Sequence, residues 1–175
     1  GRMSALPEVT LRRRVVLVTG GTQGIGEGIA RAAAEAGAAG VCITGRDAAR
    51  GAAVAASLGV TACFVAADLA DAAATARIVE QAEAALGPVD ALVNAAGLTD
   101  RGTIIDTPVE LWDRLFAVNA RAPFILTQAM ARRLKALRRP GAIVNVITMS
   151  SHGGQPFLTA YAASKGALAT LTKNT

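Results

Sequence analysis

TGGTQGIG, residues 19–26, is a glycine-rich turn between an apolar run and an Ala-rich segment of helical period. The run Val15–Val18 predicts a buried strand, and residues 25–36 predict a helix that Gly37 ends. Glycines let the backbone turn sharply and approach a ligand where a Cβ would collide. The N–H groups and dipole at a helix N-terminus favour anions. The turn therefore predicts a site for a dinucleotide pyrophosphate, formed by Gly20, Thr22, Gln23, Gly24, Ile25 and Gly26.

The same alternation of short apolar runs and longer helical segments continues to the end of the chain. Further strands are expected at residues 41–44, 63–66, 91–93 and 142–147. Further helices are expected from Asp47 toward Leu58, over 71–86, from Pro108 to the basic residues before Pro140, and over 158–171. Continuous apolar strands separated by helices are typical of a parallel sheet covered on both faces. The predicted fold class is α/β, a doubly wound parallel sheet with a Rossmann-like three-layer α/β/α architecture.

Length and composition are consistent with one dinucleotide-binding domain over residues 1–175. The 175 residues are 52% hydrophobic and 18% charged, which excludes a disordered chain and allows one buried core. No apolar run reaches the roughly 18 residues of a membrane span. Residues 1–11 lack a signal-peptide core, so we expect a cytoplasmic protein. Cys42 and Cys63 lie in apolar runs and are expected to be small buried thiols.

The formal net charge of +5 is concentrated in residues 12–14 and 132–139. A basic surface can bind nucleic acid or membranes. Few aromatic residues lie among these cations, and the second group suits a solvated helix end. We therefore expect no nucleic-acid and no membrane partner. The only histidine, His152, has no cluster of further ligands, so we expect a loop residue and no metal site.

The spacing Thr-Gly-x-x-x-Gly-x-Gly resembles the classical short-chain dehydrogenase/reductase (SDR) family. The chain also carries the family's other motifs in the family's order, over roughly residues 14–173. These are Asp68-Leu69, Asn94-Ala95-Ala96-Gly97, Val118-Asn119 and Tyr161-Ala162-Ala163-Ser164-Lys165.

The resemblance implies a bound dinucleotide at several of these positions. Asp68 would accept from the adenine amino group, and the Leu69 backbone would also contact the adenine. Asn94, Ala95 and Gly97 would line the cofactor near the adenine-side ribose. A helix-capping role for Asp68 and a simple strand-end turn at 94–97 are the structural alternatives.

Arg46 indicates which dinucleotide binds. It follows Gly45, near the place where many NAD-dependent relatives have a carboxylate for the ribose 2′-hydroxyl. A guanidinium pairs bidentately with a phosphate, which favours NADP. NAD stays the alternative, because Arg46 could be a plain surface arginine and Asp47 could serve a ribose hydroxyl.

Tyr161 and Lys165 are four residues apart and share one helix face. A free phenol titrates near pH 10. A neighbouring ammonium group and an oxidised nicotinamide both favour the phenolate. The resemblance makes Tyr161 the general acid/base, and Lys165 the residue that assists it and holds the nicotinamide ribose.

Two further polar residues complete the catalytic set that the resemblance implies. Asn119 would help to hold a water in a proton relay to the lysine, or else satisfy a backbone bend. The substrate-orienting serine of the family corresponds to Thr148, which keeps the hydroxyl and adds a stiffening methyl. Ser150 is the alternative donor, and a site without an essential hydroxyl is a third reading.

The sequence thus predicts an NADP(H)-dependent oxidoreductase that interconverts a ketone and a secondary alcohol, such as a 3-oxoacyl thioester, a sugar or polyol, or a small ketone. An NAD-dependent alcohol or polyol dehydrogenase and a dinucleotide-binding module without turnover are the alternatives. By resemblance we expect a homodimer or homotetramer. Members of the family continue past the tyrosine helix with further strands and a substrate lid, and we expect these to be absent from the 175 residues. We expect that the molecule has such a remainder and that the 175 residues omit it, rather than that the molecule itself is a fragment.

Overall fold

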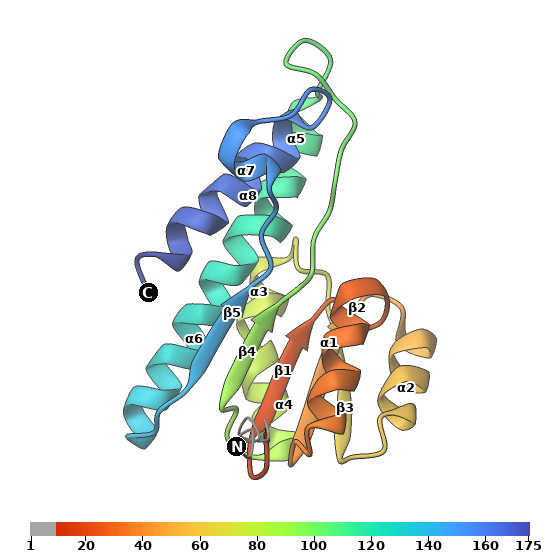
Figure 1. Ribbon diagram of the computed structural model, residues 1–175, viewed down its shortest axis with the longest axis vertical. Helices are drawn as coiled ribbons and strands as arrows, with labels where there is room; N and C mark the ends of the chain where they lie inside the picture. The colour runs from red at the N-terminus through yellow and green to blue at the C-terminus, as the bar shows by residue number, and fades with distance from the viewer. Residues whose placement is uncertain (1–9) are drawn as a thin grey trace, which may run out of the picture.

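A computed structural model describes residues 10–175 as a parallel sheet flanked by helices (Figure 1). The five strands lie in the order β3-β2-β1-β4-β5, and every neighbouring pair is parallel. Their bounds are β1 Val15–Thr19, β2 Gly40–Gly45, β3 Ala62–Ala66, β4 Ala91–Asn94 and β5 Ala142–Asn145. The order reverses between β1 and β4, where the crossover passes from one face of the sheet to the other. This confirms the predicted doubly wound α/β fold.

Helices cover both faces of the sheet (Figure 1). They are α1 Gly24–Glu35, α2 Ala48–Ser57, α3 Ala72–Ala76, α4 Ile78–Leu86, α5 Val109–Phe116, the π-helical η1 Ala117–Arg121, α6 Ala122–Leu137, α7 Ser150–Gly153 and α8 Thr159–Thr172. Side chains alternate along β1, so Leu17 packs into a core with Ile78 and Leu126, while Val18 packs into a second core with Ala30. The two cores lie on opposite faces of β1.

The segment expected as one helix over 71–86 is instead two helices that meet at Arg77. Asp71 caps the first of them by accepting from the backbone N–H groups of Ala73 and Ala74. Thr75 Oγ1 then donates to the Asp71 carbonyl at 2.7 Å, a side-chain bond that competes with the helical backbone. The Arg77 N–H turns to the carbonyl of Ala74. The local bonding therefore ends the first helix after one turn.

The long helix expected after Pro108 contains a π-helical segment at its centre, the element η1. Pro123 follows this segment and has no N–H to donate to the preceding turn. A proline in a helix interior also crowds the carbonyl four residues earlier, and a wider turn relieves that contact. The helix continues unbroken to Leu137, but its register changes where Asn119 lies.

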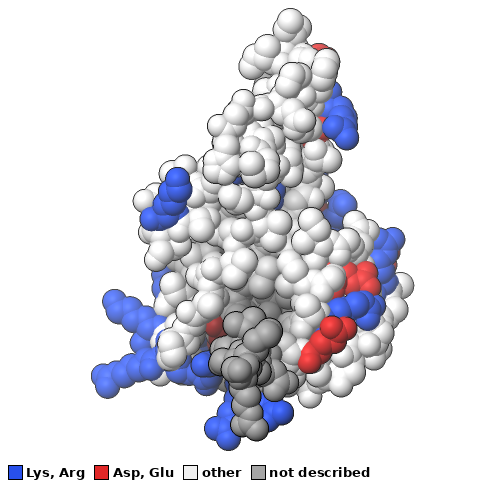
Figure 2. Space-filling model, viewed as in Figure 1, with Lys and Arg blue, Asp and Glu red and all other residues white. Residues whose placement is uncertain are grey.

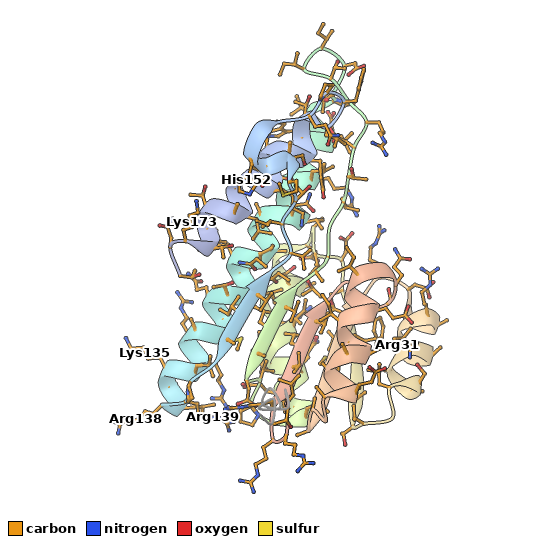
Figure 3. The ribbon with its side chains drawn as sticks, viewed as in Figure 1. Arg31, Lys135, Arg138, Arg139, His152 and Lys173 are labelled. Atoms are coloured by element: carbon orange, nitrogen blue, oxygen red, sulfur yellow. The ribbon has the colours of Figure 1, made fainter. Side chains whose placement is uncertain are left out.

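Three smaller differences from expectation concern the end of strand β5, the conformation at His152 and the exposure of Cys63. Strand β5 ends at Asn145 rather than at residue 147, and the short helix α7 follows it. His152 lies in this helix, exposed (Figure 3), instead of in a loop. Cys42 is buried as expected, but Cys63 is only half-buried because β3 is an edge strand.

Lys135, Arg138 and Arg139 lie at the end of the molecule where the strands begin, and other basic residues are spread over the rest of the surface (Figures 2 and 3). Buried Asp90, just before β4, holds two of them: Arg139 at 2.6 Å and Arg14 at 3.6 Å. Asp90 also accepts from the N–H of Val15 at 2.9 Å. These cations therefore brace the amino edge of the sheet. Within residues 10–175, no helix is both long and apolar enough to cross a membrane.

Candidate active site

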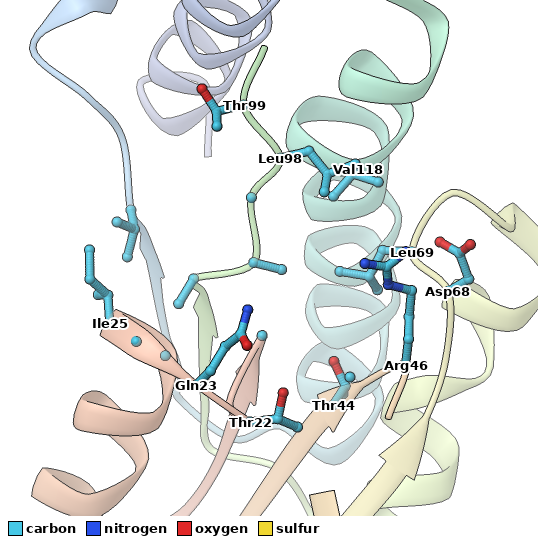
Figure 4. Close-up of a pocket in the computed structure, with 18 of the residues that line it drawn as sticks. Thr22, Gln23, Ile25, Thr44, Arg46, Asp68, Leu69, Leu98, Thr99 and Val118 are labelled. Atoms are coloured by element: carbon cyan, nitrogen blue, oxygen red, sulfur yellow. The ribbon is translucent and has the colours of Figure 1, made fainter. Parts of the chain in front are cut away.

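A cavity of about 780 Å³ opens at the edge of the sheet where the strands end (Figure 4). It lies over the reversal of strand order between β1 and β4, which is where open α/β sheets bind ligands. Most of the predicted binding residues line it: Gly20, Thr22, Gln23, Gly24, Ile25, Gly26, Arg46, Asp68, Leu69, Ala95, Gly97, Tyr161 and Lys165. The fold thus brings the glycine-rich turn and the tyrosine helix to one cavity.

The glycine-rich turn is closely packed where it leaves β1. Gly20 has φ +65°, and a Cβ on it would lie 2.7 Å from the Cα of Ala96. A Cβ on Gly26 would lie 2.1 Å from the Gly20 carbonyl oxygen. Helix α1 begins at Gly24, and the preceding Gln23 gives it no side-chain cap. The amino end of α1 therefore keeps unbonded N–H groups at the cavity wall.

Asp68 and Arg46 form the wall at the ends of β2 and β3 (Figure 4), and Arg114 from α5 also lines the cavity there. Asp68 accepts from the Ala70 N–H at 2.9 Å, and Arg114 from α5 pairs with it at 3.1 Å. The Ala70 N–H lowers the pKa of the Asp68 carboxyl most strongly, burial opposes it, and the hydrogen bond and charge of Arg114 and the charge of Arg46 each lower the pKa by a smaller amount. Asp68 is therefore a charged acceptor that also stabilises the turn after β3.

Arg46 and Arg50 differ in how firmly they are held. Among the described residues, Arg46 has no hydrogen-bond or ion-pair partner, and it faces the cavity. Arg50 donates to Gln23 and lies 3.6 Å from Asp47. Asp47 in turn caps α2 by accepting from the Arg50 N–H at 2.9 Å. The carboxylate of Asp47 is thus used by the helix end.

Tyr161 and Lys165 lie on α8 and line the same cavity. Lys165 is 3% exposed, and its Nζ donates to the Val146 carbonyl at 2.8 Å. Burial lowers its pKa from 10.5 to about 8. A Cβ on Gly97 would lie 3.4 Å from the same Nζ, so glycine leaves room beside the ammonium group.

Asn119 lies behind the cavity wall rather than in it. Its Oδ1 accepts from the Leu98 N–H, and its Nδ2 donates to the Leu98 carbonyl, both at 2.8 Å. The Nδ2 also donates to Ser164 Oγ at 3.0 Å. The side chain therefore joins η1 to the segment after β4 and to α8. The bend-satisfying and water-holding roles considered above both stay predictions.

Asn94, Thr148 and Ser150 also lie outside the lining of the cavity. Asn94 is buried and donates to Asn145 Oδ1 at 2.8 Å, which joins β4 to β5. Thr148 Oγ1 lies 3.1 Å from Ser150 Oγ, just before α7. The two candidate hydroxyls therefore share one hydrogen bond, and the choice between them stays open.

Several lining residues were not expected from the sequence: Thr44, Arg50, Leu98, Thr99, Arg114, Val118, Val146 and Ile147. Arg50 had a detectable signal, because a cation in the first turn of a helix opposes the helix dipole. Arg114 had none, since only the folded chain brings α5 to the end of β3. In the described part of the chain, no group of three or more metal-binding side chains comes together.

Comparisons with known proteins agree with this arrangement. The chain is 39% identical over 166 residues to NADP-dependent (R)-specific alcohol dehydrogenase of Lentilactobacillus kefiri, across 94% of this chain and 66% of that protein. It is 42% identical over 145 residues to inactive 2-(S)-hydroxypropyl-CoM dehydrogenase 2 of Xanthobacter autotrophicus, across 83% of this chain and 62% of that protein. A gluconate 5-dehydrogenase of Burkholderia cenocepacia, solved with NADP and tartrate, aligns with TM-score 0.89 and 35% identity over 98% of this chain and 68% of its own.

The chain spans about half to two thirds of the length of the curated relatives that it matches. The family model described as short chain dehydrogenase matches residues 14–175, which is nearly all of the chain. The matched region includes the glycine-rich turn, both halves of the sheet and the tyrosine helix. The chain therefore belongs to the short-chain dehydrogenase family.

Proposed function

We propose that this protein is an NADP(H)-dependent oxidoreductase that interconverts a ketone and a secondary alcohol. The observation that carries the proposal is one cavity lined both by the glycine-rich turn with Arg46 and by Tyr161 with Lys165. Sugars, polyols, small ketones and 3-oxoacyl thioesters are the substrates to test. A related alcohol dehydrogenase is named as NADP-dependent and a similar structure holds NADP, which supports the cofactor assignment.

The residues of the cavity fit a phosphorylated dinucleotide. The uncapped amino end of α1 offers N–H groups to the pyrophosphate. A Cβ on Gly24 would meet no atom within 4 Å, so the turn borders open space. The buried Thr44 Oγ1 has no partner among the described residues and also lines the cavity. The guanidinium of Arg46 would hold the 2′-phosphate. These are groups that a nucleotide would satisfy.

The proposed reaction transfers a hydride and a proton, and the side chains of this protein act on the proton and on the carbonyl oxygen. NADPH, when bound, supplies a hydride to the carbonyl carbon of the substrate. Tyr161 donates its phenolic proton to the carbonyl oxygen, and it accepts that proton back in the direction of alcohol oxidation. The buried ammonium of Lys165 favours the charged phenolate during this transfer. Thr148 would donate a hydrogen bond to the same oxygen.

Turnover of NADPH with a panel of ketones tests the proposal directly. We expect loss of NADPH absorbance with at least one ketone or sugar, measured on the full-length protein. Binding of NADPH without turnover of any of these compounds would favour the non-catalytic module. The similarity to a dehydrogenase named inactive makes this second outcome worth measuring.

Arg46→Ala is expected to lower kcat/KM for NADPH by about 10- to 100-fold, because a charge-assisted hydrogen bond to a phosphate contributes about 1.5–3 kcal/mol. The value for NADH should hardly change, since NADH has no 2′-phosphate. Arg132→Ala, an exposed arginine on α6, is the matched control. A wild-type preference for NADH would refute the role of Arg46 and favour the NAD-dependent alternative.

Thr148→Val is expected to lower kcat by about 100-fold if its hydroxyl polarises the carbonyl, as for the loss of one donor to a developing oxyanion. Ser150→Ala removes the neighbouring hydroxyl and should have a smaller effect. Steady-state kinetics of the two variants separates the candidates. Full activity of Thr148→Val would remove Thr148 from the mechanism, and a larger loss in Ser150→Ala would assign the role to Ser150.

Three further parts of the proposal concern the whole protein. Residues 1–175 would form a single dinucleotide-binding domain, and the protein would act in the cytoplasm. It would associate as a homodimer or homotetramer. Phe124 on α6 is 46% exposed and belongs to the apolar stretch that such a contact would use. Light scattering on the purified full-length protein measures this association.

A further inference from the structure

The tyrosine helix α8 begins without a cap of its own. Its N-cap residue, Leu158, makes no side-chain hydrogen bond to the first turn. The first N–H groups of any helix have no partner inside the helix. In α8 these belong to Thr159, Ala160 and Tyr161, and Ala160 is fully buried. Buried N–H groups need partners from elsewhere in the fold.

The segment that follows β4 supplies all three partners. Asp100 Oδ2 accepts from the Ala160 N–H at 3.1 Å, and Asp100 Oδ1 accepts from the Tyr161 N–H at 3.3 Å. The carbonyl of Gly102 accepts from the Thr159 N–H at 3.3 Å. The Ala162 N–H then bonds to the Leu158 carbonyl, 2.8 Å away, and so begins the regular helical series. Asp100 is 5% exposed, so its carboxylate is committed to this helix end.

The same segment is fixed to the rest of the site two residues earlier. Asn119 holds both backbone groups of Leu98, and it also bonds to Ser164 on α8. Leu98 and its neighbours Gly97 and Thr99 line the cavity. Asp100 therefore joins the wall of the cavity to the start of the helix that carries Tyr161. The hydrogen bond to the Tyr161 N–H is made at the residue proposed to transfer the proton.

We infer that Asp100 is a positioning residue for the reaction: its carboxylate caps α8 across 60 residues of chain and fixes where the Tyr161 phenol stands in the cavity. A carboxylate suits the partial positive charge at a helix N-terminus. An ordinary N-cap residue would fix only the helix end. Asp100 fixes the helix end to the cavity wall, so its loss displaces Tyr161 relative to the cavity. This inference rests on the proposed function.

The test compares Asp100→Ala and Asp100→Asn with wild type and with Asp106→Asn. Asp106 lies in the same segment, is exposed and accepts from Thr103, and among the described residues it makes no hydrogen bond to α8, so it is a matched control. We expect kcat to fall about 10- to 100-fold in Asp100→Ala, because small misplacements of a catalytic group have effects of this size. Asp100→Asn keeps one acceptor oxygen and should be intermediate. The Kd for NADPH should stay at the wild-type value.

Hydrogen exchange of the peptide covering the start of α8 gives a second measurement that does not depend on turnover. Its amides should exchange faster in both Asp100 variants than in Asp106→Asn. If Asp100→Ala fails to fold, Asp100→Asn carries the same comparison. Wild-type kcat in the Asp100 variants, equal loss of NADPH binding and turnover, or unchanged exchange would each overturn the inference. A wild-type protein without turnover would overturn the proposed function, while the exchange data would still decide whether Asp100 caps α8.

Discussion

Tyr161→Phe is expected to lower kcat by about 10²- to 10⁴-fold, the usual contribution of a positioned general acid/base. The substitution removes one oxygen and leaves the ring in the wall of the cavity. The hydrogen bonds of the Tyr161 N–H and carbonyl to Asp100 and Ser164 involve the backbone and should persist. NADPH should therefore bind as it does to wild type.

Fluorescence titration with NADPH and single-turnover kinetics measure these two quantities separately. Trp112→Phe is a suitable control, because Trp112 stacks on Phe116 outside the lining of the cavity. The sequence holds one tyrosine, so an ultraviolet titration of phenolate reports on Tyr161 alone. Undiminished turnover in Tyr161→Phe would refute the proposed mechanism, and NADPH that binds away from the glycine-rich turn would refute the proposed site.

Lys165→Met is expected to lower kcat by about 10²-fold or more, because it removes the charge that favours the phenolate. Methionine has a flexible apolar side chain that can fill the space of the lysine stem. The hydrogen bond from Nζ to the Val146 carbonyl is lost with the charge. NADPH should also bind more weakly if this ammonium holds the nicotinamide ribose.

The same variant should change how stability depends on pH. The pKa of Lys165 is about 8 in the folded protein, and in the unfolded chain the lysine has its usual pKa of 10.5. Below pH 8, both the folded and the unfolded chain therefore carry the proton. Between these values the unfolded chain binds more protons than the folded one, and the free energy of unfolding rises with pH by up to about 3 kcal/mol.

Chemical denaturation of wild type and Lys165→Met, without cofactor, measures this rise from pH 7 to 10.5. The difference between the two curves isolates Lys165, because the other titrating groups are common to both proteins. We expect wild type to gain stability relative to the variant as the pH rises. Parallel curves would show that burial does not lower the pKa of Lys165 in the folded protein.

Much of the fold could be predicted because its signals are local. An apolar run such as Val15–Val18, a glycine-rich turn and an Ala-rich segment each report their own conformation. The cap of α2 by Asp47 was visible in the same way, since the capping residue and the helix are adjacent in the chain. Placement of the turn and of Tyr161 at one edge then follows from the parallel sheet.

The features that escaped prediction depend on contacts between distant segments. The ion pair of Arg114 with Asp68 joins residues that are 46 positions apart in the sequence. The cap of α8 by Asp100 joins residues that are 60 positions apart. The π-helical turn has a nearer cause in Pro123, but a proline alone is equally consistent with a kink or a helix start. Choosing among these needed the packing of η1 against the segment after β4.

The contact between Asn119 and Leu98 has a consequence for which side chains position 119 can hold. The amide gives and takes one hydrogen bond with the same residue, as a neighbouring peptide group would. It therefore satisfies the Leu98 backbone beyond the end of β4, as a neighbouring strand would. An aspartate of equal size would set an oxygen against the Leu98 carbonyl oxygen. Position 119 therefore requires a side chain that carries both a hydrogen-bond donor and an acceptor.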